Sequence, residues 1–530
     1  MERVRVTPAS PVKNVLWNWG ALAFSIAVTL VLSPYIVRRL GDTAYGLWVL
    51  LGSLVGYLGL LDFGIRGAVT RYVAKLHAAA ADAEASRIAS TAATIVTIAA
   101  VVAVVGSVVL ATSIVQNFDI TPAETATARI VVILGGLTIA ATLLGGVFGG
   151  IVIGVQRFDL NGQIEIGVGI VRALGIYIAL RVGFGLVALA VIQLAVSVAR
   201  TGASAWLAGR LYPTLRLRFG VWEREALREL VSFSLYSTLL VFSSTLILYS
   251  DSVVIGALLP VQAITFFAIA SNLTSYARAL IGGLSSTLGP RASALEVQGG
   301  DQIRQVTLRA SRIATLLILP IALTFLLRGE AFIGLWMGAR YAETSGEILR
   351  ILTYGLVGWT TGQVTLYAVI GVNRHKGLVP FYIAEAVINL GLSLLWVRQM
   401  GLPGAAWGTT VPTLVSWLLV MPWYARRTLG IPLRDYWTQI WLRPLVAMIP
   451  FAVGTAVIDV YWPAQNLVSY FAGVTAVLPL AVAGAWAVAL EPPERERLRL
   501  WSTILRRREP TWPVTRPATQ PDVARPGTPP

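Results

Sequence analysis

Fourteen stretches of about twenty mostly apolar residues follow one another along this 530-residue chain. At about 1.5 Å per residue, each is long enough to cross the hydrocarbon core of a bilayer as an α-helix. Apolar residues make up 56% of the chain and charged residues only 13%, which is too few charges to cover soluble domains. The sequence therefore predicts an all-α polytopic membrane protein without a large soluble catalytic domain. The expected spans are 14–36, 44–66, 88–113, 129–153, 163–183, 185–208, 230–255, 261–286, 309–328, 347–371, 377–397, 402–424, 440–461 and 465–490.

The basic residues are distributed unevenly between the two sides of these spans. With the N-terminus in the cytoplasm, Lys and Arg favour the cytoplasmic loops by roughly four to one, as the positive-inside rule requires. We therefore expect both termini to be cytoplasmic. The net charge of +16 is spread over short loops and a tail, so it does not predict a nucleic-acid partner.

Two parts of the chain share short motifs at a spacing of 216 to 220 residues. Gly-Val-Gln-Arg at 154–157 corresponds to Gly-Val-Asn-Arg at 371–374, Gly185 corresponds to Gly401, and Arg71 corresponds to Arg291. Together these matches indicate duplication of a six-helix unit, which gives two six-helix lobes. Because six is an even number, the two lobes have the same orientation in the membrane, and we expect a transport path between them. The expected segments are a cytoplasmic N-terminus (1–13), an N-lobe (14–208), a linker (209–229), a C-lobe (230–424), two extra helices (440–490) and a disordered basic, Pro-rich cytoplasmic tail (491–530).

Several kinds of chemistry lack the residues that they need. The chain has no cysteine and two histidines, His77 and His375, so thiol catalysis and His/Cys metal sites are not expected. No Gly-rich phosphate loop of the Walker type is present, so ATP is not the expected energy source. We expect no cofactor, no bound metal and no enzymatic activity.

The run from Leu32 to Lys75 carries a recognisable set of motifs. It contains Pro34, Leu40-Gly41, Tyr45-Gly46 and Asp62-Phe63-Gly64 followed by Arg71. This run resembles the start of the polysaccharide transporter family, the O-antigen-flippase-like branch of the multidrug, oligosaccharidyl-lipid and polysaccharide exporter superfamily. Asp251 followed by Val254-Ile255-Gly256 is similar to the same family's seventh helix.

The resemblance implies a flippase of the bacterial inner membrane that works by alternating access. Its substrate would be a polyprenyl-diphosphate-linked oligosaccharide for cell-surface polysaccharide biosynthesis, moved along a path lined by the first, second, seventh and eighth helices. Its partners would be membrane lipids and polysaccharide polymerase machinery, with no nucleic acid. The alternatives are an ion-coupled drug or small-solute antiporter of the same superfamily, and a membrane glycosyltransferase or polymerase.

Ionisable residues inside the spans are candidate site residues, since each costs about 2.5 to 3.5 kcal/mol on insertion scales. Arg278 lies deep in the eighth span, and its guanidinium fork suits diphosphate oxygens, so we predict that it binds substrate unless it pairs with a carboxylate. Arg66 and Asn18 are the further substrate-binding candidates. Asp62 and Arg66 could equally form a local i,i+4 pair that has only a structural role.

Two more carboxylates, Asp251 and Glu385, have no cation nearby in the sequence. A buried carboxylate without a partner can carry a proton, so with Asp62 they are the candidate coupling residues, for protons or for sodium.

Three charged residues of the fifth and sixth spans are expected to form structural pairs. Seven residues, or about 10.5 Å of helical rise, separate Glu165 from Arg172, so each needs a partner on another helix. Arg200 on the sixth span could pair with Glu165.

Overall fold

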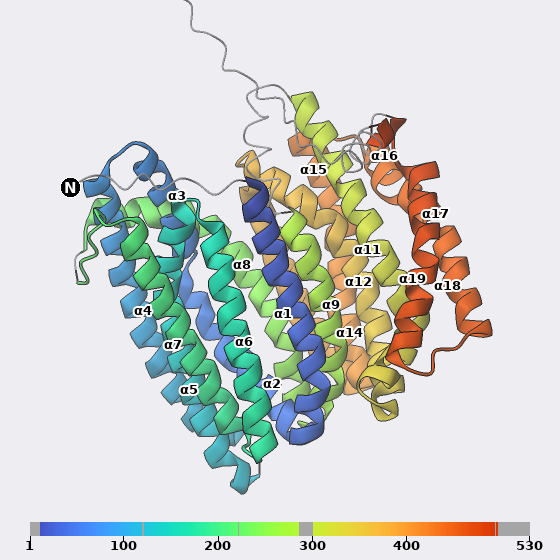
Figure 1. Ribbon diagram of the computed structural model, residues 1–530, viewed down its shortest axis with the longest axis horizontal. Helices are drawn as coiled ribbons and strands as arrows, with labels where there is room; N and C mark the ends of the chain where they lie inside the picture. The colour runs from blue at the N-terminus through green and yellow to red at the C-terminus, as the bar shows by residue number, and fades with distance from the viewer. Residues whose placement is uncertain (1–10, 119–120, 221, 286–299, 493, 497–530) are drawn as a thin grey trace, which may run out of the picture.

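The computed structural model describes residues 11–118, 121–220, 222–285, 300–492 and 494–496. The described residues are helical almost throughout and contain no β-strand. Figure 1 shows the helices as a bundle in which the first and last described residues lie at the same end. We call this end the termini end and the opposite end the distal end.

The helices follow the apolar stretches of the sequence closely. The first half contains α1 (Pro11–Leu40), α2 (Asp42–Gly56), η1 (Tyr57–Asp62), α3 (Ile65–Ala78), α4 (Asp82–Asn117), α5 (Pro122–Gly154), α6 (Phe158–Val182) and α7 (Leu186–Leu211). The second half contains α8 (Arg224–Leu258), α9 (Ala263–Ser285), α11 (Gly300–Trp336), α12 (Ala339–Gly371), η2 (His375–Leu378), α13 (Val379–Met400), α14 (Leu402–Val415), η3 (Ser416–Val420) and α15 (Met421–Leu429). The chain ends with α16 (Leu433–Asp435), η4 (Tyr436–Leu442), α17 (Arg443–Ala447), α18 (Ile449–Tyr461), α19 (Leu467–Gly484) and η5 (Ala485–Ala489).

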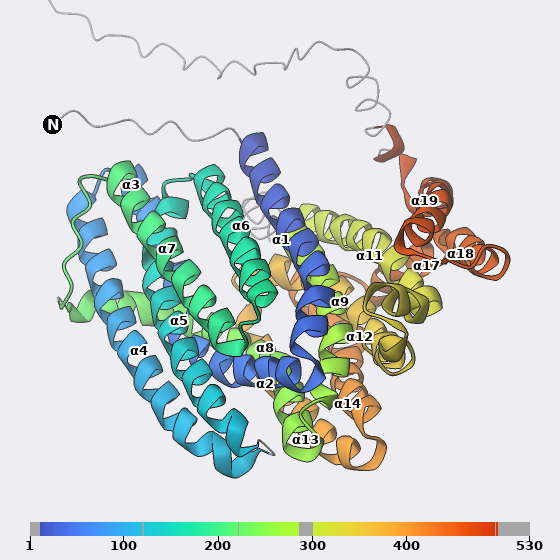
Figure 2. The same ribbon diagram turned by 60° about the horizontal axis from the view of Figure 1, so that its bottom comes forward.

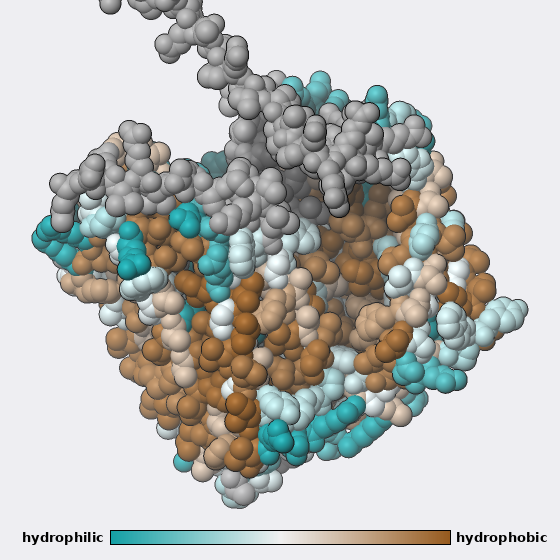
Figure 3. Space-filling model, in the orientation of Figure 1, coloured by the Kyte–Doolittle hydropathy of each residue, from teal (hydrophilic) through white to brown (hydrophobic). Residues whose placement is uncertain are grey.

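The predicted membrane fold is confirmed. Thirteen helices or joined helices among the described residues are long and apolar enough to cross a membrane. The helix α12, with 33 residues, occupies the position of the remaining predicted span. On the face shown in Figure 3, hydrophobic side chains form a broad belt and hydrophilic ones gather toward the two ends, as expected for a protein surrounded by lipid.

The helices pack as two groups and a short C-terminal addition. In the first group α5 packs against α4 and α7, and α6 packs against α1 and α7. In the second group α12 packs against α9, α11 and α14, and α13 packs against α8 and α14. The helix α2 contacts both α8 and α9 and so joins the groups, while α18 and α19 pack on α11 (Figures 1 and 2).

The two halves share an unusual turn. Gln156 follows α5 with φ 62° and Asn373 follows α12 with φ 53°, both in the left-handed region that few side chains adopt. The repeated Gly-Val-Gln-Arg and Gly-Val-Asn-Arg motifs therefore form the same local structure. Arg291, the expected counterpart of Arg71, lies outside the described residues.

The second predicted span is not one continuous helix, contrary to the expectation for 44–66. The helix α2 ends at Gly56 and continues as the 3₁₀ turn η1 to Asp62. Phe63 (φ 46°) and Gly64 (φ 69°) then adopt left-handed conformations before α3 begins. Two consecutive left-handed residues cannot continue a right-handed helix, so the Asp-Phe-Gly motif breaks the span.

Candidate transport site

A buried carboxylate lies among hydroxyl groups inside the second group. Asp251, on α8, is only 5% exposed. Its Oδ2 accepts a hydrogen bond from Oγ1 of Thr409 at 2.7 Å, and its Oδ1 accepts one from Oγ of Ser393 at 3.3 Å. Asn389 donates to Oγ1 of Thr409 at 2.8 Å and accepts from Ser250 at 3.0 Å. We call these five residues the Asp251 cluster; its oxygens come from α8, α13 and α14 and could hold a proton or a small cation.

The structure brings Arg278 and Glu385 close to this cluster. Glu385, on α13, is 5% exposed and bonds to hydroxyl groups of Ser416 and Thr413. The guanidinium of Arg278, on α9, interacts electrostatically with both Glu385 and Asp251. No hydrogen bond or ion pair within 4 Å joins it to another described residue, and its Nε is buried without a partner.

Arg278 is therefore the nearby cation that the sequence did not reveal for the two carboxylates. The indole ring of Trp359, 5.5 Å from its Cζ, supports the guanidinium on one side. Its charge is shared between two carboxylates and is not locked to either of them.

A polar cavity lies inside the first group. Its volume is 350 Å³, and it is bounded by α1, α5, α6 and α7. Glu165 and Arg200 form an ion pair in its wall, while Arg172 has no ion pair with another described residue. We call this space the first-group cavity; its lining residues are Ala21, Leu22, Phe24, Ser25, Val28, Thr142, Glu165, Val168, Gly169, Arg172, Gln193, Val196, Ser197 and Arg200.

Asp62 and Arg66 lie behind this cavity, but not as a side-chain pair one helical turn apart. Asp62 ends η1, and its carboxylate accepts a hydrogen bond from the backbone N–H of Arg66 at the start of α3. The guanidinium of Arg66 interacts electrostatically with Arg200, Glu165 and Asp62. Gly150 of α5 permits the close approach of α3 to α5 at Arg66, because a Cβ on residue 150 would lie 3.1 Å from the carbonyl oxygen of Arg66.

The remaining substrate-binding candidate, Asn18, lies on α1, and its side chain is outside the described part of the structure. Of the nine candidates, the structure thus gathers Asp251, Glu385 and Arg278 in the second group, and Glu165, Arg172, Arg200, Asp62 and Arg66 in the first.

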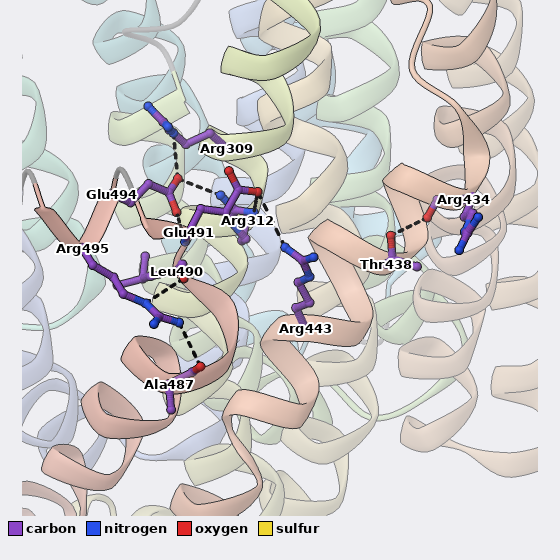
Figure 4. Close-up of polar contacts among 10 residues, drawn as sticks. All are labelled: Arg309, Arg312, Arg434, Thr438, Arg443, Ala487, Leu490, Glu491, Glu494 and Arg495. Atoms are coloured by element: carbon purple, nitrogen blue, oxygen red, sulfur yellow. Dashed lines mark hydrogen bonds and ion pairs between the residues drawn. The ribbon is translucent and has the colours of Figure 1, made fainter.

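The sequence did not indicate two fully buried arginines of α11. Arg312 is 1% exposed and donates to Glu491 at 2.9 Å and to Glu494 at 2.7 Å (Figure 4). Arg328 is 1% exposed and donates to Asp459 at 2.9 Å. Both lie near predicted span ends, where a cation normally reaches the interface, and their partners are far away in the sequence.

The predicted tail 491–530 thus begins with a docked segment. Glu494 is buried because it pairs with Arg309 at 2.7 Å as well as with Arg312, which neutralises its charge. Burial alone would raise the pKa of Glu494, but the backbone N–H of Glu491 and the guanidinium of Arg312 outweigh burial and hold this pKa below its ordinary value. Residues 497–530 lie outside the described part of the chain.

Paired and unpaired charges inside a bundle of membrane helices are typical of transporters, and comparison with known proteins identifies the family. The chain belongs to the polysaccharide biosynthesis protein family, whose model matches residues 12–296. This finding confirms the family resemblance seen in the sequence. A Shigella flexneri protein named "Putative O-antigen transporter" is 20% identical over 424 residues, which cover 79% of this chain and 98% of that protein.

Solved structures with the same fold are transporters and flippases. The inward closed conformation of the lipid II flippase MurJ aligns with a TM-score of 0.67 at 12% identity and covers 89% of this chain and 99% of its own. An inward-facing multidrug resistance transporter of the MATE family, in the MOP superfamily, aligns with a TM-score of 0.66 at 17% identity and covers 82% and 97%. At these identities the likeness shows the fold alone.

Proposed function

We propose that this protein is a flippase that moves a polyprenyl-diphosphate-linked oligosaccharide across the bacterial inner membrane by alternating access. It acts as a transporter and not as an enzyme, and it supplies polysaccharide polymerase machinery on the far side. The two helix groups correspond to the two lobes, and the termini end faces the cytoplasm, as the distribution of Lys and Arg predicts. Family membership and the shared fold support this proposal.

The observation that carries the proposal is the cationic first-group cavity. Arg172 and Arg200 line it, Arg66 lies behind it, and the nearby carboxylates are Glu165 and Asp62. Three cations against two anions leave a positive charge within an apolar bundle, where an uncompensated ion is costly. An acidic headgroup would remove that cost, and guanidinium groups match its phosphate oxygens.

Arg278 was the first sequence candidate for the diphosphate, but two carboxylates already lie near it. In the proposed mechanism it also serves as the counter-charge of Asp251 and Glu385, the coupling residues. Entry of a proton or sodium ion there would release the guanidinium toward the substrate. One charge moved through about 100 mV yields about 2.3 kcal/mol, enough to bias the two orientations roughly 50-fold.

The test is a reconstituted flipping assay with a fluorescent polyprenyl-diphosphate sugar. We expect Arg172→Gln to raise KM about tenfold or more, since a hydrogen bond to a charged group contributes about 1.5 to 3 kcal/mol. Arg181→Gln, an exposed cation near the end of the same helix, is the matched control and should change little. Arg278→Gln should alter the dependence on the ion gradient as well as the rate.

The outcomes separate the function from the residue assignments. Failure of the wild-type protein to move any lipid-linked sugar would refute the flippase. Normal KM in Arg172→Gln would refute the cavity as headgroup site, and unchanged gradient dependence in Arg278→Gln would refute its place in coupling.

The fold of the MATE transporter favours one second candidate, an ion-coupled antiporter of drugs or small solutes. Proteoliposomes distinguish the two, since an antiporter would move cationic dyes against an imposed ion gradient without any lipid carrier. Dye transport together with failure to flip lipid-linked sugar would favour the antiporter.

A further inference from the structure

A carboxylate of the first group reaches into the second group at the distal end. Asp42 is the first residue of α2, and its side chain is only 7% exposed. Its Oδ1 accepts a hydrogen bond from the hydroxyl of Tyr341 at 2.5 Å, and its Oδ2 lies 2.6 Å from a guanidinium nitrogen of Arg340. Both partners lie in the first turn of α12. The contact therefore connects the α1–α2 corner with the α11–α12 corner.

The backbone around Asp42 is held as closely as its side chain. Thr265, at the start of α9 and fully buried, donates from Oγ1 to the backbone oxygen of Asp42 at 2.6 Å. One turn further along α2, a Cβ on Gly46 would overlap the carbonyl oxygen of Val261. Only glycine allows the two groups to approach this closely at that position.

A third connection lies beside the first two. The indole N–H of Trp336, the last residue of α11, donates to the carbonyl oxygen of Leu30 in α1 at 2.8 Å. Bonds from α9, α11 and α12 thus all converge on α1 and the first turn of α2. They hold the two groups together at the distal end.

The two side-chain partners of Asp42 differ in strength in a way that suits a reversible contact. Arg340 is 69% exposed, so water and salt screen its attraction for the carboxylate. The hydroxyl of Tyr341 is buried, and a hydrogen bond to a carboxylate is stronger there. The carboxylate also lies at the N-terminus of α2, where the helix dipole favours negative charge.

We propose that Asp42 is the gate residue of the distal end, which must release Tyr341 and Arg340 each time the two helix groups separate there. It is a positioning residue, since it would act on transport by holding the helices and without touching the substrate. The proposal takes from the proposed function only that the distal end faces outward and that the groups separate; the contact itself does not depend on the substrate.

The absence of cysteine from the chain makes a direct test possible. Asn272 lies on α9 seven residues after Thr265, or about 10.5 Å deeper in the bundle. It faces the first group, because its Nδ2 lies 3.4 Å from the hydroxyl of Tyr45. In Asn272→Cys the single thiol reports opening of the distal end when a membrane-impermeant maleimide is added outside intact cells.

The gate predicts an order among variants made on this background. Asp42→Asn should raise the initial labelling rate about tenfold or more, the factor expected when one charge-assisted hydrogen bond is weakened. Tyr341→Phe should have a smaller effect and Arg340→Gln the smallest, because the guanidinium is exposed. Asp42→Glu, which keeps the charge, should restore part of the slow labelling.

Glu343→Gln is the matched control, since it removes an exposed carboxylate two residues after Tyr341 on α12. It should label like the parent. Equal labelling of the parent, Asp42→Asn and Tyr341→Phe would overturn the proposal. If Asp42→Asn does not fold, Tyr341→Phe decides, because it removes only one hydroxyl group.

A second measurement connects the gate to transport. A disulfide between Asp42→Cys and Thr265→Cys should stop flipping, and a reductant should restore it. Flipping that continues while the disulfide is intact would refute the gate. A labelling response from a protein that flips no lipid-linked sugar would leave the gate standing and refute the flippase.

Discussion

Removal of one buried guanidinium should release the segment that follows the last helix. Arg312, on α11, is 1% exposed and bonds to two carboxylates, Glu491 and Glu494. In Arg312→Met the Glu494 side chain, 7% exposed, would keep only one cationic partner, Arg309, which is 36% exposed. Breaking a buried pair costs about 3 to 5 kcal/mol, and the remaining partner places the expected value near 3. The segment from Leu490 to Arg495 should therefore open about a hundredfold more often.

Amide hydrogen exchange measures this opening directly. The backbone N–H groups of Glu494 and Arg495 both donate to the carbonyl oxygen of Glu491, at 2.9 and 3.0 Å, so their exchange requires the segment to open. Arg443→Gln is the matched control, because this guanidinium is 46% exposed and lies 3.6 Å from Glu491. It should cost less than about 1 kcal/mol, or at most a fivefold change.

A double variant separates loss of the ion pair from loss of packing. With Glu494→Gln the neutral amide needs no cation, so adding Arg312→Met should cost clearly less than it does alone. Exchange in Arg312→Met within about threefold of the wild type would refute the reasoning, since it would correspond to less than about 0.7 kcal/mol. Strict additivity in the double variant would refute the electrostatic origin.

Two further changes test the same view of the packing. The docked state depresses the pKa of Glu494 below its ordinary 4.5, so docking is fully stabilised above that value and loses this stabilisation as the pH falls through the depressed pKa. Protection of the segment against hydrogen exchange, corrected for intrinsic exchange rates, should therefore fall on acidification. In Glu494→Gln this protection should stay constant. Gly362→Ala should destabilise the protein by about 1 to 3 kcal/mol, because its Cβ would overlap the ring of Trp417, which is only 3% exposed. The thermal unfolding midpoint in detergent measures this loss. Gly391→Ala is the control, because a Cβ there meets open space, and it should leave the midpoint unchanged or slightly higher.

The membrane fold was predictable from the sequence because apolar length and loop charge are local properties. The same holds for the repeated turns after α5 and α12, whose motifs recur in the sequence. The break after Asp62 was harder to predict, since a window of apolar residues does not reveal that Phe63 and Gly64 adopt left-handed conformations. Hydropathy measures transfer to the membrane and carries no information on backbone dihedral angles.

The partners of the buried charges could not be predicted in the same way. Glu385 lies more than a hundred residues from Arg278, and Arg312 lies still further from Glu491 and Glu494. A charge near a span end favours the interface unless another helix supplies a partner, and which helix does so depends on the packing of the whole bundle. Asp42 was missed for the same reason, since a residue between two spans is normally solvated.

The buried charges divide into two kinds once their partners are known. Arg312 is paired with carboxylates, and removal of a partner would leave an uncompensated charge, so it fixes the packing of helices. Arg172 and Arg278 are half-buried and have no ion pair with another described residue, although an unpaired charge among membrane helices is costly. In the proposed mechanism a further group completes each site during the cycle: an anion beside Arg172, and a change in the charge of Asp251 or Glu385 beside Arg278. An anionic substrate in the first group and a cation in the second would therefore compensate the charges of different halves of the molecule. The helix α2, with its Asp42 contact, joins the two groups, so that occupation of one site can bias the conformation of the other group.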